Sequence, residues 1–172
     1  MEWSSIILID SGFNFFKGNG IAMKIKKVFN NNVVLTEDES DKELVVMGRG
    51  LAFQKKVGNP IDIEKIEKTF VISSKNFVSK FSELLDEIPY EIMILSQAII
   101  DMAREDLQSK LNDSLYLSLS DHIHFAITRS EEGLLIKNAL MSEVQKFYQD
   151  EYRVAKKALY LIEDRLGIRL AE

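Results

Sequence analysis

Apolar and polar positions alternate with a period of two through the early part of the chain, as in a β-strand. In the first such stretch Ile25, Lys27 and Phe29 share one face. The three asparagines at 30–32 predict a turn, because asparagine tolerates a left-handed backbone and bonds to its own peptide groups. Further strands are predicted at 33–36 and 43–47, joined by a polar hairpin turn at 37–42, and then at 51–56 and 70–72.

These short, closely spaced strands predict a small antiparallel sheet. Such a sheet is too small to bury both faces within one chain, so pairing of two copies is expected to cover the second face. Residues 1–22 do not follow the pattern and are interpreted as an extension of unclear origin, with an added strand at 6–9 as the alternative. Glu2 and the short apolar run that follows are unlike a secretory signal.

From residue 73 onward the apolar positions repeat with the period of an α-helix. Helices are predicted over 77–88, 92–102, 140–148 and 152–166. Another is predicted at 121–132, with Ser120 and Asp121 as capping residues and Gly133 after its end. Gly167 is expected to end the last helix. The fold class is therefore α+β, with a small antiparallel β domain followed by an all-α helical bundle.

Charge is distributed unevenly between these two parts. Residues 23–60 hold seven basic and five acidic side chains, a net charge of +2, whereas residues 61–172 hold 14 basic and 20 acidic ones, a net charge of −6. This asymmetry favours two different roles. The chain has no cysteine, which excludes disulfides and thiolate chemistry and fits a reducing cytoplasm. No apolar run approaches the roughly 18 residues that a membrane span needs.

The strand-like run at 43–47 breaks at Gly48-Arg49-Gly50, and the break admits two interpretations. A phosphate-binding loop needs a different glycine spacing and a following helix, and this segment has neither. A tight turn or bulge fits better, because glycine permits positive φ, and it displays Arg49 to base edges or phosphates. Phe53, followed by two lysines, is a candidate stacking platform for RNA, with burial in the core as the alternative.

His122 and His124 are the only histidines in the sequence. A metal site is not predicted, because residues two apart on a helix do not share a face and a third ligand is missing. His122 beside Asp121 is a candidate for proton transfer or covalent phosphorylation, with a hydrogen-bonded surface histidine as the alternative. Neither a nucleophile–base pair nor a cofactor motif stands out, so an enzyme is not predicted.

Two stretches, MKIKKVFNNNVVL from Met23 and KELVVMGRGLAFQKK from Lys42, resemble the RNA-binding module of the BglG/SacY/LicT transcriptional antiterminators. The similarity runs over residues 23–70, and LSDHIHFAI at 119–127 resembles that family's first regulatory domain, the PRD of the phosphotransferase system. The resemblance implies a module that dimerises and binds an imperfect RNA hairpin, so that a terminator cannot fold. The implied partners are leader mRNA, a second copy of the chain and a sugar permease of the phosphotransferase system, with HPr as a further candidate.

The resemblance also implies roles for individual residues. RNA contacts are expected at both turns and on the last strand, from Lys27, Asn30, Asn32, Gly48, Arg49, Phe53 and Gln54. Asparagine amides suit base edges and 2′-hydroxyls, arginine suits base edges and phosphates, and a phenylalanine ring stacks on an unpaired base. His122 matches a histidine that sugar permeases phosphorylate, whereas His124 has no equivalent role.

The expected layout is an extension at 1–22, a CAT-type RNA-binding domain at 23–78 and a PRD-type helical domain at 79–172 in a cytoplasmic protein. The family pattern continues beyond this sequence with a second phosphorylatable histidine and a second PRD. The helical domain is therefore interpreted as incomplete, with apolar surface uncovered near Ile162 and Leu166. The alternative function is a regulation-deficient fragment whose helical domain only mediates protein–protein contacts.

Overall fold

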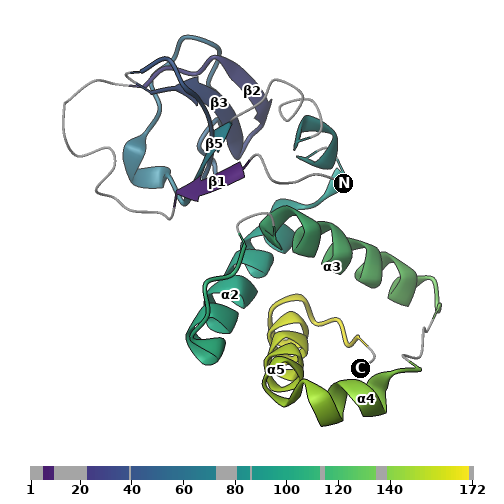
Figure 1. Ribbon diagram of the computed structural model, residues 1–172. Coiled ribbons are helices and arrows are strands. Elements are labelled where there is room, and N and C mark those ends of the chain that lie inside the picture. Colours follow the sequence, from purple (N-terminus) through teal and green to yellow (C-terminus); the bar gives the residue numbers. More distant parts are fainter. Residues whose placement is uncertain are drawn as a thin grey trace. The chain divides into compact units, whose positions relative to one another are not determined.

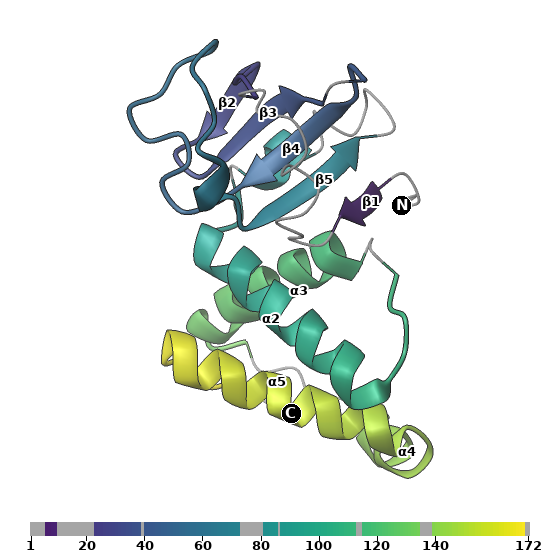
Figure 2. The same cartoon turned by 90° about the vertical axis from the view of Figure 1, so that its left-hand side faces the viewer.

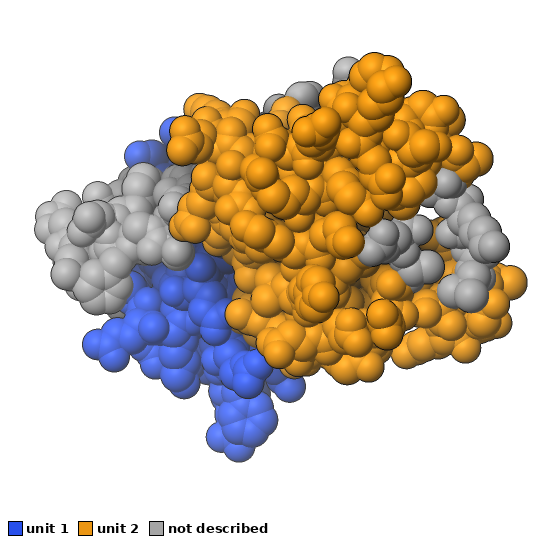
Figure 3. All heavy atoms as spheres, turned by 90° about the horizontal axis from the view of Figure 1, so that it is seen from below, with its two compact units in different colours: residues 1–87 blue, residues 88–172 orange. Residues whose placement is uncertain are grey.

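The computed structural model describes residues 6–9, 23–38, 40–72, 81–85, 87–112, 115–134 and 139–170. The chain divides into two compact units, Met1–Glu87 and Ile88–Glu172, which Figure 3 colours separately. Unit 1 contains all the described strands and unit 2 contains the four long or medium helices of the described chain (Figure 1). The predicted α+β class, with the β part first and the helical part second, is confirmed.

Unit 1 is built on an antiparallel sheet of five strands in the order β1-β5-β4-β3-β2, which can be followed in Figure 2. The strands are β1 (Ile6–Ile9), β2 (Lys27–Asn30), β3 (Val33–Glu37), β4 (Glu43–Met47) and β5 (Lys68–Ile72). β1 pairs with β5 from Ile6 opposite Ile72 to Ile9 opposite Thr69. The added strand at 6–9, given above as an alternative, is therefore confirmed, and the rest of 1–22 lies outside the described residues.

The β3–β4 hairpin turn is held by the side chain of Asp38. Its carboxylate accepts hydrogen bonds from the backbone N–H groups of Ser40 at 2.8 Å and Lys42 at 2.9 Å. Asp41 completes the turn in the left-handed region, with φ of 58°. An aspartate that satisfies backbone donors in this way makes a tight polar turn favourable, and the predicted hairpin turn is confirmed.

One face of the sheet packs against loops of unit 1. Val34 and Val46 lie opposite each other in neighbouring strands and share this face. They pack with Ile25, Leu51 and Ala52, all of which are buried. The segment that follows β4 is therefore tied to the core by apolar burial, although it is not itself a strand.

The opposite face of the sheet is also buried. It carries Val45, Met47 and Phe70, each fully inaccessible to solvent. Residues 81–85 are helical, and the ring of Phe81 lies 5.6 Å from that of Phe70 and 6.3 Å from that of Phe29. The expectation that one chain cannot bury both faces is therefore wrong, because a helical segment after the sheet supplies cover that sheet size alone does not reveal.

No strand forms at 51–56, so the strand predicted there is wrong. Consecutive tight turns occupy residues 51–54, with N–H groups donating to carbonyls three residues earlier at 3.0, 3.2 and 3.0 Å, from Leu51, Phe53 and Lys55. Gly50 and Gln54 have φ of 65° and 58°, which an extended backbone does not allow. Phe53 and Gln54 therefore lie in a turn and not on a last strand.

Unit 2 consists of α2 (Tyr90–Leu107), α3 (Leu115–Glu131), α4 (Met141–Phe147) and α5 (Gln149–Leu166). α2 packs against α3 and α5, and α4 packs against α5 (Figures 1 and 2). Buried isoleucines of three helices form the core between them, among them Ile99, Ile123 and Ile162. Gly167 ends α5 with φ of 69°, as predicted, and the predicted helical bundle is confirmed. The predicted helix at 77–88 lies partly outside the described residues.

Two expectations for unit 2 are wrong. α3 begins at Leu115 and not at 121, so Ser120 is no cap. Its hydroxyl is buried and donates to the carbonyl of Tyr116 at 2.8 Å, a bond that serine forms inside a helix. Ile162 is only 3% exposed, so its side chain is not left uncovered, whereas Leu166 is half-buried. Within the described ranges, every helix is too short or too polar to cross a bilayer.

Candidate nucleic-acid interface

In the loop after β4, the six peptide N–H groups of residues 48–53 are all bonded within the protein. Four are accepted by backbone carbonyls: Gly48 by Asn32 at 2.9 Å, Leu51 by Gly48 at 3.0 Å, Ala52 by Asn31 at 2.9 Å and Phe53 by Gly50 at 3.2 Å. Two are accepted by side chains: Arg49 by Glu67 Oε1 at 3.2 Å and Gly50 by Asn32 Oδ1 at 2.8 Å. A phosphate-cradling loop needs free N–H groups. The phosphate-loop interpretation is therefore excluded, and the tight turn is confirmed.

Gly48 lies beneath the short 3₁₀ helix η1 (Ile63–Lys65) and is buried. A Cβ atom at this position would lie 1.7 Å from the backbone oxygen of Lys65, which is far inside van der Waals contact. The close approach of two backbones requires glycine at this position. Gly48 therefore sets the path of the loop, and its predicted contact with RNA stays a prediction.

The loop presents Arg49 and Phe53 to solvent. Arg49 is exposed, and the ring of Phe53 is 61% exposed. Burial of Phe53 in the core, the alternative considered above, is therefore excluded. Gln54 is exposed beside it in the left-handed conformation. An exposed aromatic ring on the same loop as an exposed arginine is suited to stacking on an unpaired base.

The β2–β3 turn lies beside this loop and holds Asn30 and Asn32. Asn30 Oδ1 accepts the N–H of Asn32 at 2.8 Å, and Asn32 Oδ1 accepts the N–H of Gly50 at 2.8 Å. Both side-chain oxygens are therefore engaged within the protein. An asparagine amide also carries two N–H donors on Nδ2, so each side chain keeps its donor group for another acceptor.

Lys27 lies apart from this cluster, at the start of β2, while Asn30 ends the same strand. The three-residue separation corresponds to about 10 Å along a strand. The Nζ of Lys27 lies 4.9 Å from the centroid of the Phe29 ring. The neighbouring Lys26 pairs with Glu37, and this hydrogen bond raises the pKa of Lys26. Lys27 and Arg49 are thus at separate places on unit 1, and the charge of Lys26 is balanced internally.

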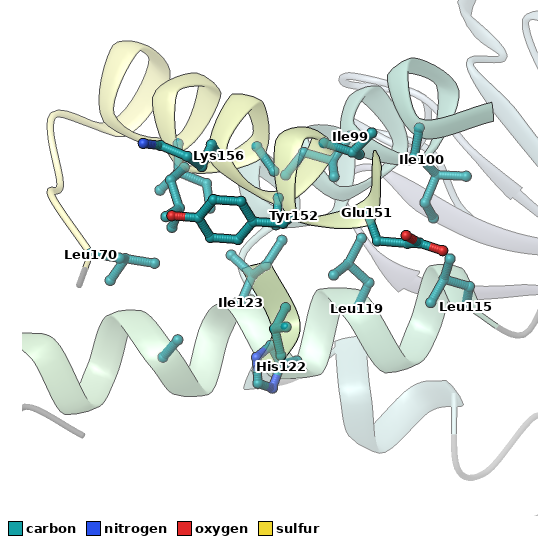
Figure 4. A pocket seen from close by; sticks show the side chains of 18 of the residues that line it. Ile99, Ile100, Leu115, Leu119, His122, Ile123, Glu151, Tyr152, Lys156 and Leu170 are labelled. Carbon is teal, nitrogen blue, oxygen red and sulfur yellow. The ribbon is translucent and has the colours of Figure 1, made fainter. Parts of the chain in front are cut away.

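His122 lies inside α3, about two turns after its first residue, Leu115. The helix-start environment expected for it is therefore wrong. Its side chain is exposed and borders a cavity of about 710 Å³ in unit 2, shown in Figure 4. His124 is half-buried and does not line the cavity, as expected for residues two apart on a helix.

The cavity is lined mainly by aliphatic side chains of α2, α3 and α5, with Ile99, Ile123 and Leu119 labelled in Figure 4. A few polar or charged residues also line it, namely His122, Arg129, Ser130, Glu151, Tyr152 and Lys156. No three His, Asp or Glu residues come together as metal ligands in the described parts of the chain. The lining is therefore suited to apolar contact, with a titratable histidine at its border.

Two family models match the chain, the CAT RNA binding domain over residues 23–77 and the PRD domain over residues 97–172. The crystal structure of GlcT CAT-PRDI is 31% identical, with a TM-score of 0.73, and the match covers 88% of this chain and 90% of that one. The chain belongs to the BglG/SacY/LicT family of transcriptional antiterminators.

Curated members of the antiterminator family share more of the sequence. The transcription antiterminator LicT of Bacillus subtilis (strain 168) is 51% identical over 87% of this chain and 54% of its own length. The beta-glucoside operon antiterminator of Dickeya chrysanthemi is 45% identical over 87% of this chain and 53% of its own length. The chain thus spans about half the length of these relatives.

The sequence analysis did not predict a role for Glu67, which lies within the range matched by the CAT model. Its carboxylate bonds to the peptide of Arg49 across 18 residues. Such a contact depends on the tertiary fold, which brings η1 and β5 back beside β4. Local sequence patterns therefore do not predict it. The prediction also missed that Asn32 holds the loop through its side-chain oxygen.

Proposed function

We propose that the chain is an RNA-binding transcription antiterminator that stabilises a hairpin in the leader mRNA of a sugar-utilisation operon. The observation that carries the proposal is the loop after β4, which exposes Arg49 and Phe53 on a backbone whose N–H groups at 48–53 are all bonded within the protein. A loop whose backbone is already held has little backbone freedom left to lose when it binds. An arginine and a ring presented in this way favour a structured nucleic acid over a flexible partner.

The chemistry of the cluster indicates which RNA atoms it would contact. Asn30 and Asn32 use their side-chain oxygens within the protein, so they offer N–H donors. Acceptors on RNA include base-edge oxygens and nitrogens and the 2′-hydroxyl of the wide minor groove. Arg49 would bond to a base edge or a phosphate, and Phe53 and Gln54 would contact an unpaired base. Lys27 would add a contact further along β2, and Gly48 would allow close approach of the RNA.

The two parts of the chain would divide the work. Residues 23–78 would bind RNA as a homodimer in the cytoplasm, and residues 79–172 would regulate that binding. LicT and the beta-glucoside operon antiterminator, both named as antiterminators, support this reading of the CAT and PRD matches. A regulator that reads RNA needs no catalytic group, so enzymatic activity is not part of the proposal.

Regulation would act through His122. Its imidazole is exposed, so a phosphoryl donor can reach it, and it borders an apolar cavity. A phosphoryl group would place between one and two negative charges beside that lining. Such a charge disfavours apolar contact and so can rearrange an interface without unfolding the helices. A sugar permease of the phosphotransferase system would be the donor, with HPr as a second candidate.

RNA binding tests the proposal directly. The probe is the hairpin transcribed from the leader of the operon that carries this gene, and the titration uses the whole chain. Arg49→Ala is expected to weaken binding by about 1–3 kcal/mol, the value of a bidentate base contact. Lys42→Ala is the matched control, because it removes an exposed positive charge at the opposite end of β4. Equal affinity of wild type for the hairpin and for an unrelated duplex would refute the proposal.

The regulatory part has its own test. Purified phosphotransferase proteins are expected to phosphorylate wild type and His124→Ala, but not His122→Ala. Sedimentation of the chain with and without the hairpin tests the proposed dimer in parallel. A monomer that binds the hairpin at full affinity would contradict the dimer, and phosphorylation of His122→Ala would contradict the assignment of the acceptor.

A further inference from the structure

The loop that carries Arg49 is held from both sides. On the side of β3, Asn31 and Asn32 accept three of its peptide N–H groups. On the side of β5, residues 65–67 contact it at successive positions. The oxygen of Lys65 lies against Gly48, and the peptide N–H of Glu67 donates to the carbonyl of Met47 at 2.8 Å. The side chain of Glu67 then accepts the N–H of Arg49 at 3.2 Å.

Among these contacts, the bond to Glu67 is the one made by the peptide of Arg49 itself. The N–H groups of Gly48 and Ala52 are held by backbone oxygens, which no substitution removes. The N–H of Arg49 depends on a side chain. Without that acceptor the peptide between Gly48 and Arg49 is held by one bond fewer: its carbonyl still accepts the N–H of Leu51 at 3.0 Å, but the glycines on either side of Arg49 have no side chain to restrict it. Arg49 would then start from a less restricted backbone, which widens the range of directions open to its guanidinium group.

We infer that Glu67 is a positioning residue for RNA recognition, which orients Arg49 by holding its peptide N–H. The inference rests on the proposed function, because it concerns the same RNA contact. Glu67 is exposed and negatively charged, so its charge alone opposes the approach of RNA. Its hydrogen bond favours binding and its charge disfavours it. The two effects have opposite signs, and substitutions can therefore separate them.

Three variants of the whole chain separate the effect of the Glu67 hydrogen bond from the effect of its charge. Glu67→Ala removes the acceptor and the charge, Glu67→Gln removes the charge and keeps an oxygen acceptor, and Glu64→Ala removes an exposed carboxylate from η1 nearby. With the leader hairpin as probe, Glu67→Ala is expected to raise Kd roughly 3- to 10-fold, the effect of losing one ordering hydrogen bond. Glu67→Gln and Glu64→Ala are expected to leave Kd unchanged or lower it, because each removes a repulsive charge. Binding to a fully paired duplex of equal length is expected not to weaken in any variant.

Amide hydrogen exchange without RNA supplies a second readout. The Arg49 N–H is expected to exchange faster in Glu67→Ala than in wild type, Glu67→Gln or Glu64→Ala, while the N–H groups of β3 and β4 keep their rates. An unchanged rate at Arg49 in Glu67→Ala overturns the inference whatever the RNA result. Hairpin affinity in Glu67→Ala equal to that in Glu64→Ala overturns it as well. A wild-type chain with no preference for the hairpin refutes the proposed function instead, and the exchange data then still show whether Glu67 holds the loop.

Discussion

Unit 1 carries Arg49 and Phe53, two of its candidate RNA contacts, on a loop with six consecutive internally bonded peptide N–H groups, whereas unit 2 places His122 beside a cavity of about 710 Å³. The loop side chains stand on a backbone that these hydrogen bonds hold on both sides. The helix side chains around the cavity have unfilled space in front of them. Both places carry exposed candidate side chains, but only the loop of unit 1 is surrounded by groups that hold its backbone.

This difference matches the two kinds of work proposed for the units. Reading an RNA surface requires that the ordering of the contacts takes place during folding, so that binding does not have to supply it. A switch requires two arrangements of similar free energy, and a loosely filled apolar interface can offer them. The comparison therefore predicts that unit 1 tolerates added volume poorly near its loop and that unit 2 tolerates it well around its cavity.

The largest effect is expected from Gly48→Ala. The new Cβ would lie 1.7 Å from the Lys65 oxygen, so one of the two backbones must move. We expect the free energy of unfolding of unit 1 to fall by about 3 kcal/mol or more, at the upper end of overpacking effects. Hydrogen exchange of the β3 and β4 amides under native conditions measures this loss.

Gly50→Ala is the matched control for that substitution. Gly50 has φ of 65°, but no atom lies within 4 Å of a Cβ built there. The cost is then only that of a left-handed alanine, about 1–2 kcal/mol. If the two variants lose equal stability, backbone conformation and not the contact with η1 explains why glycine occupies position 48.

Phe53→Ala separates recognition from stability. The ring is 61% exposed, so its removal should leave unfolding nearly unchanged. Loss of a stacked base should weaken hairpin binding by about 1–3 kcal/mol. Leu51→Ala, two residues away and fully buried, should instead cost about 2–5 kcal/mol of stability. A Phe53→Ala variant that unfolds as readily as Leu51→Ala would contradict the exposed position of the ring.

Matched alanine-to-leucine changes test the packing contrast between the units. Ala52 is 3% exposed beside the tight loop, and Ala126 lines the cavity on α3. Ala52→Leu should destabilise unit 1 by about 1–3 kcal/mol, because a filled core resists added volume. Ala126→Leu should change the stability of unit 2 by less than about 0.5 kcal/mol or increase it, because the cavity accepts the side chain. If local hydrogen exchange showed equal losses of stability in Ala52→Leu and Ala126→Leu, the proposed difference in packing between the two units would be wrong.

The sequence was sufficient for elements whose cause is local. The β3–β4 turn depends on Asp38 and its near neighbours, and the end of α5 follows apolar periodicity with Gly167 as a terminator. α2 was predicted as a helix, but it extends beyond both ends of the predicted range 92–102. The start of α3 was misjudged because Ser120 and Asp121 look like a cap. In the fold Ser120 bonds back to Tyr116 within the helix. A capping residue and a buried serine inside a helix have the same local sequence.

The candidate site was only partly predictable for the same reason. The exposure of Arg49 followed from two flanking glycines, but the geometry of its loop depends on Lys65 and Glu67, which come from a distant segment. The alternation at 51–56 suggested a strand, yet Leu51 and Ala52 are neighbours and both buried. Adjacent residues of a strand point to opposite faces, and only the tertiary fold decides that both are covered.

The smallest effect is expected from His122→Ala. The His122 side chain is exposed to solvent and belongs to the middle of α3. In the middle of a helix, alanine is more favourable than histidine by about half a kcal/mol. The loss of contact at the cavity border and this gain should nearly cancel, so the stability of unit 2 should change by less than about 0.5 kcal/mol. Ile123→Ala, next in sequence and 4% exposed, should cost about 2–5 kcal/mol. Hydrogen exchange of the α3 amides measures the stability loss in the two variants.

If His122→Ala lost as much stability as Ile123→Ala, the histidine would be part of the packing of unit 2. A loss of phosphorylation in His122→Ala would then report unfolding and not a missing acceptor. A small effect is therefore the condition under which His122 can be tested as the phosphorylation site.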